Sequence, residues 1–270
     1  MVNQLNEKVI RILLEDKVIA DREELKNPEI LNFIKHEFRF LFYHDDFVVR
    51  ENALFAFFKK NHINLDKKTI LDIGCGDCFN MVMLKKLYNA DVIGIDIQKN
   101  SLIAKKIIKE LFDMDLDVRL ANNDFKSMVE GLNSRRFDVV FLLDLVEHLD
   151  NPQSYLINLK KILKDDAYLL VLFPPYYSAY GGHYSSPYLQ YIPAFIRNRI
   201  CYDPFKSRDY RLNRLTVSKF ESYIKNEYKI IDKKMTFMSS VIDNSVLDFI
   251  SKIPYFKEIL FSWVYILQKI

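Results

Sequence analysis

Two rhythms of hydrophobic and polar positions follow one another along this chain. Residues 1–65 carry apolar positions at three- and four-residue spacing, which is typical of amphipathic helices. From Lys68 onward, short apolar runs alternate with stretches of helical periodicity. Parallel strands need crossover connections, and both faces of such a sheet must be covered. The pattern therefore predicts an α/β fold with a doubly wound, mostly parallel sheet.

The apolar runs place the expected strands at 69–73, 91–96, 117–121, 137–144, 168–173 and 229–237. Helices are expected between them at 78–88, 101–112, 154–163 and 216–228. The β-rich tail at 262–270 is expected to pair with 229–237 as an antiparallel hairpin at the edge of the sheet.

The same change of rhythm predicts how the chain is organised. A helical N-terminal extension, 1–65, is expected before a main domain at 66–270. A long stretch rich in Tyr, Pro and Arg follows the fifth strand, and insertions of that length usually cover or bind something. We therefore expect a substrate lid at about 174–215, and a helical insertion at about 243–260.

Composition narrows the class of protein. The 270 residues are 50% hydrophobic, enough for one large core, and 39 Lys and Arg against 36 Asp and Glu leave a formal charge of +3. This balance does not indicate a nucleic-acid partner. There is no signal-peptide pattern, three cysteines are too few for a disulfide framework, and the apolar runs are shorter than the roughly 20 residues of a membrane span. We expect a cytoplasmic protein without a transmembrane segment.

Two of the six glycines lie in the stretch ILDIGCGDCF, where a strand ending in Asp72 turns through Gly74 and Gly76 into a helix. Such a turn favours a nucleotide-like ligand. A dinucleotide fingerprint needs a third glycine where this chain has Phe79, so NAD is the weaker interpretation. Asp96 closes the next strand, where a carboxylate accepts hydrogen bonds from the hydroxyls of an unphosphorylated ribose. Any ligand that contains adenosine carries such a ribose, so Asp96 does not distinguish NAD from other adenosine-containing ligands.

The stretches ILDIGCGDC, VIGIDI, ANNDF and FDVVFLLDLVEHLDNP occur in the order and at the spacing of the class I S-adenosylmethionine methyltransferases, and residues 68–175 resemble this superfamily. The resemblance implies a Rossmann-like fold and S-adenosylmethionine as the cofactor. It assigns the methionine moiety to the backbone of Asp72, Ile73 and Gly74 in the loop that includes Gly76, the ribose to Asp96, the adenine to Ile97, Asp124 and the N–H of Phe125, and the amino acid end to Leu143 and Asp144.

One departure from the family pattern is Cys78, which stands where many members carry a third glycine. A side chain that crowded the loop there would lower the affinity for the cofactor. Cys75 and Cys78 also form a C-x-x-C pattern, as in redox or half-zinc sites. Without a second pair we favour two small residues in a tight turn, and no metal site is expected.

The Phe-Pro-Pro-Tyr stretch at 173–176 resembles the amino-methylating signature of DNA and glutamine methyltransferases. That signature follows the fourth strand of the family, whereas this stretch follows the expected fifth. It therefore implies no base or amide substrate. Pro174 lacks an N–H and is expected to end strand pairing, while Pro175 stiffens the exit.

Three side chains are candidates for the chemistry of methyl transfer. An oxygen acceptor benefits from a base that titrates near neutrality, which favours histidine. His183 lies in the expected lid beside two glycines, His148 lies in LVEHLDNP, and Asp144 ends the fourth strand. The alternatives are a loop histidine without a role, a helix-side residue tied to Glu147, and a solvated acid.

The interpretation we favour is a methyltransferase acting on a small molecule through oxygen, such as a glycan, a lipid or a secondary metabolite. Residues 197–214 interleave arginines with aromatic residues, which would suit an anionic or lipid-linked acceptor or form a solvated face. A macromolecule (RNA or protein) methyltransferase and a non-catalytic cofactor-binding scaffold remain alternatives. The oligomeric state is not indicated.

Overall fold

The structure is a computed structural model that describes residues 7–38, 41, 53–121, 132, 135–178, 213–237, 240–241 and 262–270. The chain divides into two compact units, Met1–Phe55 with Asn64–Phe125 and Ala56–Ile63 with Lys126–Ile270. Most of the expected lid and all of the expected helical insertion at 243–260 lie outside the described residues. The proposed domain boundaries therefore stay predictions.

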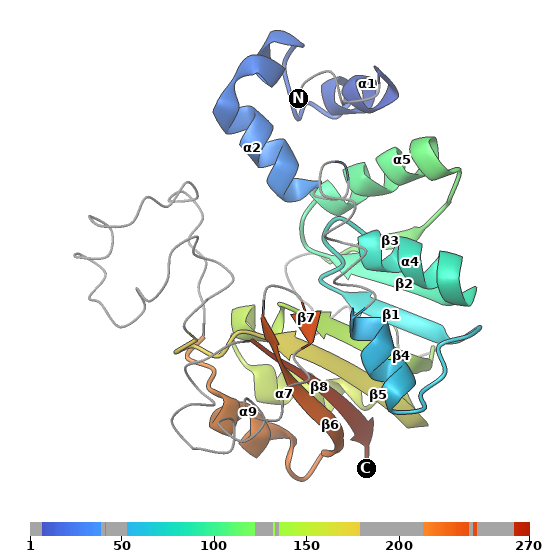
Figure 1. The fold of residues 1–270 in the computed structure, drawn as a ribbon, viewed down its shortest axis with the longest axis vertical. Helices are drawn as coiled ribbons and strands as arrows, with labels where there is room; N and C mark the ends of the chain where they lie inside the picture. The colour runs from blue at the N-terminus through green and yellow to red at the C-terminus, as the bar shows by residue number, and fades with distance from the viewer. Residues whose placement is uncertain are drawn as a thin grey trace, which may run out of the picture. The chain divides into compact units, whose positions relative to one another are not determined.

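A parallel sheet forms the centre of the first unit (Figure 1). Its strands are β1 (Thr69–Ile73), β2 (Asp91–Asp96) and β3 (Asp117–Leu120), in the order β3-β2-β1. Both pairings are parallel. The crossovers are α4 (Phe79–Tyr88) and α5 (Asn100–Phe112). β1 and β2 are buried after their first residues, as expected for strands covered on both faces.

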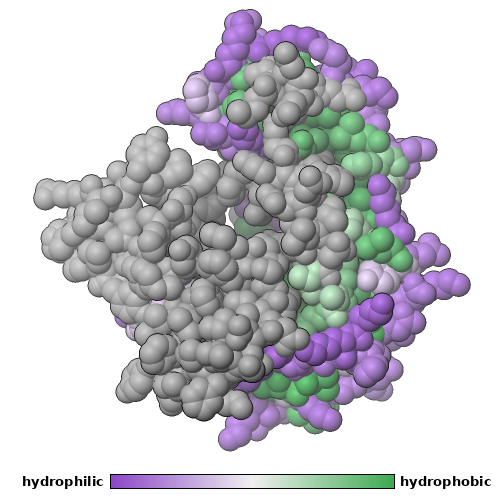
Figure 2. Space-filling view, viewed as in Figure 1, coloured by the Kyte–Doolittle hydropathy of each residue, from purple (hydrophilic) through white to green (hydrophobic). Residues whose placement is uncertain are grey.

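The N-terminal helices of this unit are α1 (Glu7–Glu15), the 3-10 helix η2 (Glu23–Lys26) and α2 (Pro28–Glu37). A further helix, 53–60, contains the boundary between the two units, which lies after Phe55. α1 packs on α5, and the ion pairs Lys8–Glu110 (2.8 Å) and Lys106–Asp16 (2.5 Å) flank that contact. Hydrophilic side chains cover much of the outer surface of α1 and α2 on the face drawn in Figure 2. The apolar side of α1 is buried, as the helical spacing predicted, and Ile34 is buried in α2.

The second unit contains a mixed sheet in the order β4-β5-β8-β6-β7. Its strands are β4 (Phe137–Leu143), β5 (Leu163–Phe173), β6 (Tyr228–Phe237), β7 (Ser240–Val241) and β8 (Ser262–Lys269). β4 and β5 are parallel, and β8 is antiparallel to both β5 and β6. The other elements are η4 (Val146–His148), α7 (Pro152–Leu159) and α9 (Val217–Ile224).

The antiparallel C-terminal strand and its pairing with 229–237 are confirmed, and the structure refines their place. β8 lies between β5 and β6 instead of at the margin, where the short β7 follows β6. Its central residues, Trp263 to Leu267, are all buried. An aromatic cluster of Phe173, Phe220 and Tyr265, with ring centroids 4.8 to 6.2 Å apart, fastens α9 onto β5 and β8.

These strands and helices confirm the predicted fold class, a mostly parallel Rossmann-like α/β sheet. No helix in the parts of the chain that the structure describes is long and apolar enough to cross a membrane.

Candidate cofactor and acceptor site

The glycine loop, residues 74–78, connects β1 to α4 in the first unit. Gly74 and Gly76 have φ values of +78° and +49°, which glycine adopts without steric cost. The N–H groups of Gly74 and Cys75 both donate to the carbonyl oxygen of Ile95, at 2.7 and 3.1 Å. The loop is therefore fastened to the end of β2, where Asp96 follows.

Asp96 is held by the same loop. Its Oδ2 accepts from the N–H of Gly76 at 2.8 Å, and its Oδ1 accepts from the N–H of Gln98 at 2.7 Å. The side chain is buried, and this burial raises the pKa of the carboxyl group, although the backbone hydrogen bonds oppose the rise. A carboxylate oxygen that accepts one hydrogen bond can accept another. Asp96 is thus fixed in position and retains capacity for ligand hydroxyls.

The remaining loop chemistry favours an adenosyl ligand over a dinucleotide. The N–H of Cys78 donates to the carbonyl of Cys75 at 2.8 Å, so four N–H groups, those of residues 74, 75, 76 and 78, are used within the protein. A pyrophosphate is bound chiefly by N–H groups of such a loop. A methionine ammonium group needs acceptors instead, which backbone carbonyls supply.

Ile97 provides the apolar part of the candidate site. It follows Asp96 directly, and 44% of its surface is exposed although it is a large aliphatic residue next to a buried strand. Nucleotide-like ligands bind where a few fixed polar groups adjoin apolar surface. The residues of the first unit therefore fit a ribose on Asp96 and an adenine on Ile97.

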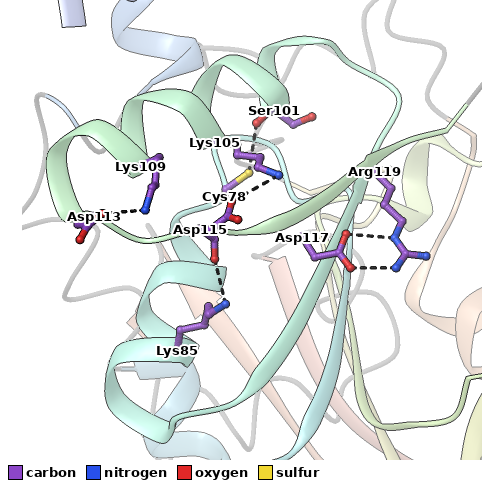
Figure 3. Close-up of polar contacts among 9 residues, drawn as sticks. All are labelled: Cys78, Lys85, Ser101, Lys105, Lys109, Asp113, Asp115, Asp117 and Arg119. Atoms are coloured by element: carbon purple, nitrogen blue, oxygen red, sulfur yellow. Dashed lines mark hydrogen bonds and ion pairs between the residues drawn. The ribbon is translucent and has the colours of Figure 1, made fainter. Parts of the chain in front are cut away.

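The thiol of Cys78 lies between the glycine loop and α5. Its side chain is fully buried, and Sγ lies 3.6 Å from the carbonyl oxygen of Ser101 in α5 (Figure 3). Sγ of Cys78 also lies 3.7 Å from the carbonyl oxygen of Gly76. Its φ of +61° lies in the left-handed region that glycine would occupy without strain. The thiol packs against α5. Replacing the family's glycine with Cys78 therefore places a residue with a side chain in a strained backbone conformation.

Cys75 and Cys78 are both free and buried, with their sulfurs 4.0 Å apart. The hydrogen bond with Cys78, together with burial, raises the pKa of the Cys75 thiol well above its usual value. A thiol that resists deprotonation is a poor nucleophile and metal ligand. The chemistry of the pair therefore favours the packing interpretation of C-x-x-C.

Gly94 is a site residue that the sequence analysis missed. A Cβ atom at this position of β2 would lie 2.4 Å from Sδ of Met81 and 2.9 Å from Sγ of Cys75. Glycine here leaves room for the Met81 and Cys75 side chains, which would have to shift to make space for a larger residue. The available signal was a glycine inside an otherwise apolar strand, which often marks a close approach.

The second unit contains the candidates that follow β4. Leu143 ends this strand, and Asp144 has a φ of +52° while its N–H donates to the carbonyl of Leu172 at 2.9 Å. A left-handed aspartate at the carboxyl end of a parallel strand is typical of a functional turn. The 3-10 turn η4 follows, with Glu147 buried and His148 half-buried.

The Pro-Pro-Tyr stretch follows the fifth strand, as expected from the sequence. Pro174 and Pro175 follow β5, which is parallel to β4 and comes after it in the chain. The N–H of Tyr176 donates to the carbonyl of Leu215 at 2.7 Å, which ties this exit to the segment before α9. The Arg214 guanidinium lies 5.9 Å from the Tyr176 ring centroid.

The structure therefore gathers the predicted site residues into two groups. Asp72, Ile73, Gly74, Gly76, Asp96 and Ile97 cluster in the first unit, and Leu143, Asp144 and His148 follow one another in the second. Asp124, Phe125 and His183 lie outside the described residues. The roles assigned to all of these residues stay predictions.

A family model described as a methyltransferase domain matches residues 71–171, which include the glycine loop, Asp96 and β4. Residues 71–171 are a methyltransferase domain. The match confirms the resemblance to the class I S-adenosylmethionine-dependent methyltransferases, and the sheet described above is the fold of that class.

Curated relatives of the methyltransferase domain share its sequence over part of their length. A mitochondrial ubiquinone biosynthesis O-methyltransferase of Dictyostelium discoideum is 32% identical over 110 residues, which are 38% of this chain and 34% of the relative. A ubiquinone biosynthesis O-methyltransferase of Ruegeria sp. (strain TM1040) is 34% identical over 95 residues, 35% of this chain and 36% of the relative. The chain thus spans about a third of the length of these two relatives.

A solved structure shows the same fold at lower identity. The magnesium protoporphyrin IX methyltransferase of Synechocystis PCC 6803, determined with bound SAH, has a TM-score of 0.54 and 16% identity, and the match covers 88% of each chain. At this identity the likeness concerns the arrangement of strands and helices.

Proposed function

We propose that the chain transfers the methyl group of S-adenosylmethionine to a hydroxyl oxygen of a small molecule. The observation that carries the cofactor assignment is the Asp96 carboxylate, fixed by the N–H groups of Gly76 and Gln98 beside the exposed Ile97. The names of the curated relatives support oxygen as the acceptor atom. Quinone precursors, lipids, glycans and secondary metabolites are the acceptor classes to be compared.

When bound, S-adenosylmethionine supplies an electrophilic methyl group on a sulfonium. In this proposal the chain contributes mainly orientation, since in-line displacement requires the acceptor oxygen about 3 to 3.5 Å from the methyl carbon. Asp96 would orient the ribose, and the resemblance assigns the amino acid end of the cofactor to Leu143 and Asp144. His148 or His183 would accept the hydroxyl proton as the C–O bond forms and the methyl group's bond to the sulfonium sulfur breaks, with S-adenosylhomocysteine as the leaving group. The proton then leaves to water.

The cofactor part of the proposal is tested first, by calorimetric titration of S-adenosylhomocysteine into the purified chain. Asp96→Ala is expected to weaken binding by about 1 to 3 kcal/mol, because a charged hydrogen-bond acceptor is lost. Asp91→Ala is the matched control, since Asp91 begins the same strand and lies at its opposite end. Equal affinity of the Asp96 and Asp91 variants would reject the ribose role.

The acceptor part is tested by following S-adenosylhomocysteine release with a panel of catechols, phenols, aliphatic alcohols and sugar phosphates. Turnover of a hydroxyl compound that is lost in Asp96→Ala would support the proposal. Turnover only with RNA or protein would favour the macromolecule alternative. Tight cofactor binding without any turnover would favour a scaffold.

A further inference from the structure

One asparagine in the second unit caps the loop that follows β4. Asn213 lies shortly before α9, at the end of the segment expected to form the lid. Its Nδ2 donates to the carbonyl oxygens of Val146 and Leu149, each at 2.9 Å, and its backbone N–H donates to the carbonyl oxygen of Glu147 at 2.8 Å. A single residue thus satisfies three carbonyl groups of the loop 145–149.

The carbonyl groups of Glu147 and Leu149 need such a partner because η4 is only three residues long, and the carbonyl of Val146 accepts from Asn213 in addition to its bond within η4. Its own hydrogen bonds run from the N–H of His148 to Leu145 at 2.9 Å and from the N–H of Leu149 to Val146 at 3.4 Å. A one-turn helix leaves its last carbonyls without regular intrahelical partners. An amide NH₂ can serve two carbonyls at once, whereas an aspartate of the same shape offers only acceptors.

The orientation of the Asn213 amide has a consequence. With Nδ2 directed at two carbonyl groups, Oδ1 is buried and accepts no hydrogen bond from the residues that the structure describes. Turning the amide over would place its oxygen against those carbonyls, which is the worse arrangement. The two donors therefore determine how Asn213 sits.

The capped loop occupies a place where function is expected. It begins directly after Asp144, at the carboxyl end of β4, and ligands of open α/β sheets bind at the carboxyl ends of the strands. The hydrogen bond from Tyr176 to Leu215 fixes the other side of the same segment to the exit of β5. Asn213 thus ties the β4 loop to one end of the expected lid, and the hydrogen bond between Tyr176 and Leu215 joins the two ends of that segment.

We propose that Asn213 is a positioning residue that holds the loop 145–149, and with it Asp144, in the conformation that binds the cofactor's amino acid end. This inference rests on the function proposed above. Asn213 acts through the loop and is assigned no contact with the reacting atoms.

The test compares Asn213→Ala and Asn213→Asp with a matched control, Asn61→Ala. Nδ2 of Asn61 also donates twice within the second unit, to the carbonyl of Phe57 at 2.9 Å and to Oδ2 of Asp232 at 3.1 Å, and neither partner belongs to the loop. The measurements are amide hydrogen exchange of residues 145–149, the melting temperature, and calorimetric affinity for S-adenosylhomocysteine.

Asn213→Ala is expected to accelerate exchange in the loop and to weaken S-adenosylhomocysteine binding about tenfold, because two hydrogen bonds are lost. Asn213→Asp should be more severe, and Asn213→Gln, which keeps both donors, should lie between alanine and the wild type. Asn61→Ala should lower the melting temperature while loop exchange and affinity stay at the wild-type level.

Wild-type loop exchange in Asn213→Ala would overturn the proposal. So would faster exchange with unchanged affinity, because Asn213 would then be purely structural. If the wild type fails to bind S-adenosylhomocysteine, the proposed function fails, and hydrogen exchange still decides whether Asn213 holds the loop. If the alanine and aspartate variants do not fold, Asn213→Gln and Asn213→Ser supply both measurements, and a folded Asn213→Ser with wild-type loop exchange and wild-type affinity would contradict the amide's role.

Discussion

Burial and hydrogen bonding act on the Asp96 carboxyl group in opposite directions, and burial prevails. Its pKa is raised above the ordinary value of 3.8 by desolvation, against hydrogen bonds from Gln98, Gly76 and Ile97. The free energy of unfolding therefore decreases as the pH rises through this elevated pKa, because the native state has to ionise a buried carboxyl group. Ligand hydroxyls can donate to the charged form of this carboxyl group.

Affinity for S-adenosylhomocysteine should therefore fall as the pH is lowered through the raised pKa of Asp96, because a protonated carboxyl group loses acceptor capacity. The decline should begin at a higher pH than an exposed aspartate would give. Calorimetry over a pH series measures it. Asp96→Asn, which cannot titrate, is the control and should show weak binding without this dependence; an identical pH profile in both proteins would contradict the prediction.

Because the backbone at Cys78 is strained, glycine should be at least as stable there as alanine, which reverses the usual order of the two residues in helices. Both Cys78→Gly and Cys78→Ala remove the buried thiol, but only glycine relieves the left-handed φ of +61°. The free energy of unfolding of the glycine variant should equal or exceed that of the alanine variant, by up to about 1 kcal/mol after the entropy of the unfolded chain is included. Urea denaturation measures the difference.

The same pair at Met83 serves as the reference, because Met83 lies inside α4 with ordinary helical surroundings. There alanine should exceed glycine by about 1 kcal/mol. If the alanine variant were more stable than the glycine variant by the same amount at both positions, the backbone of Cys78 would not be strained in solution.

At the level of elements, one buried hydroxyl joins β6 to α7. The hydroxyl of Tyr228 donates to the carbonyl oxygen of Leu156 at 2.7 Å. Leu156 lies in the last turn of α7, where carbonyl groups have no partner within the helix. Burial also raises the pKa of Tyr228 far above its ordinary value, so the hydroxyl stays a donor.

Tyr228→Phe should lower the free energy of unfolding by about 1 to 3 kcal/mol, since a buried carbonyl is left unsatisfied. Thermal or urea denaturation measures the change. Tyr223→Phe is the comparison, because Tyr223 lies half-buried on the neighbouring α9 and its ring contact with Lys219 survives the substitution. Equal losses in both variants would contradict the importance of this link.

The sequence predicted where the strands lie along the chain far better than which strands pair with one another. Apolar runs located β1 and β2 to the residue because both strands are buried, while β5 begins at Leu163, earlier than its apolar run. Its residues 164–166 are polar, and Asp165 and Asp166 are exposed, so periodicity could not reveal them. The insertion of β8 between β5 and β6 was missed as well, because strand order depends on long-range pairing.

The candidate site shows the same division. Gly74, Gly76 and Asp96 were predictable because a tight turn and a strand-end carboxylate leave local marks in a sequence. The left-handed φ of Asp144 and the hydrogen bonds of Asn213 were not. Asn213 lies 67 and 64 positions from its two side-chain partners, and no local pattern encodes such a contact.

For the molecule as a whole, cofactor binding should be visible as stabilisation. A ligand present at about 100 times its Kd stabilises the native state by about 2.7 kcal/mol, which corresponds to a rise in melting temperature of roughly 5 to 10 °C for a chain of this size. S-adenosylhomocysteine should produce this shift in the wild type at saturating concentration. Differential scanning fluorimetry measures it.

Asp96→Ala should show a much smaller shift at the same ligand concentration. NAD is the competing ligand in this experiment. A larger shift with NAD than with S-adenosylhomocysteine would contradict the cofactor assignment.

The position of β8 bears on the order of events when the protein is made. Among the strands that the structure describes, β6 is connected to β5 through the strand 262–269, which follows both of them in the chain. While a ribosome is still translating that stretch, the partly made sheet presents two open strand edges. Such edges invite pairing with other chains. We therefore expect the second unit to complete its sheet only after residue 269 has left the exit tunnel, and to depend until then on chaperones that cover those edges.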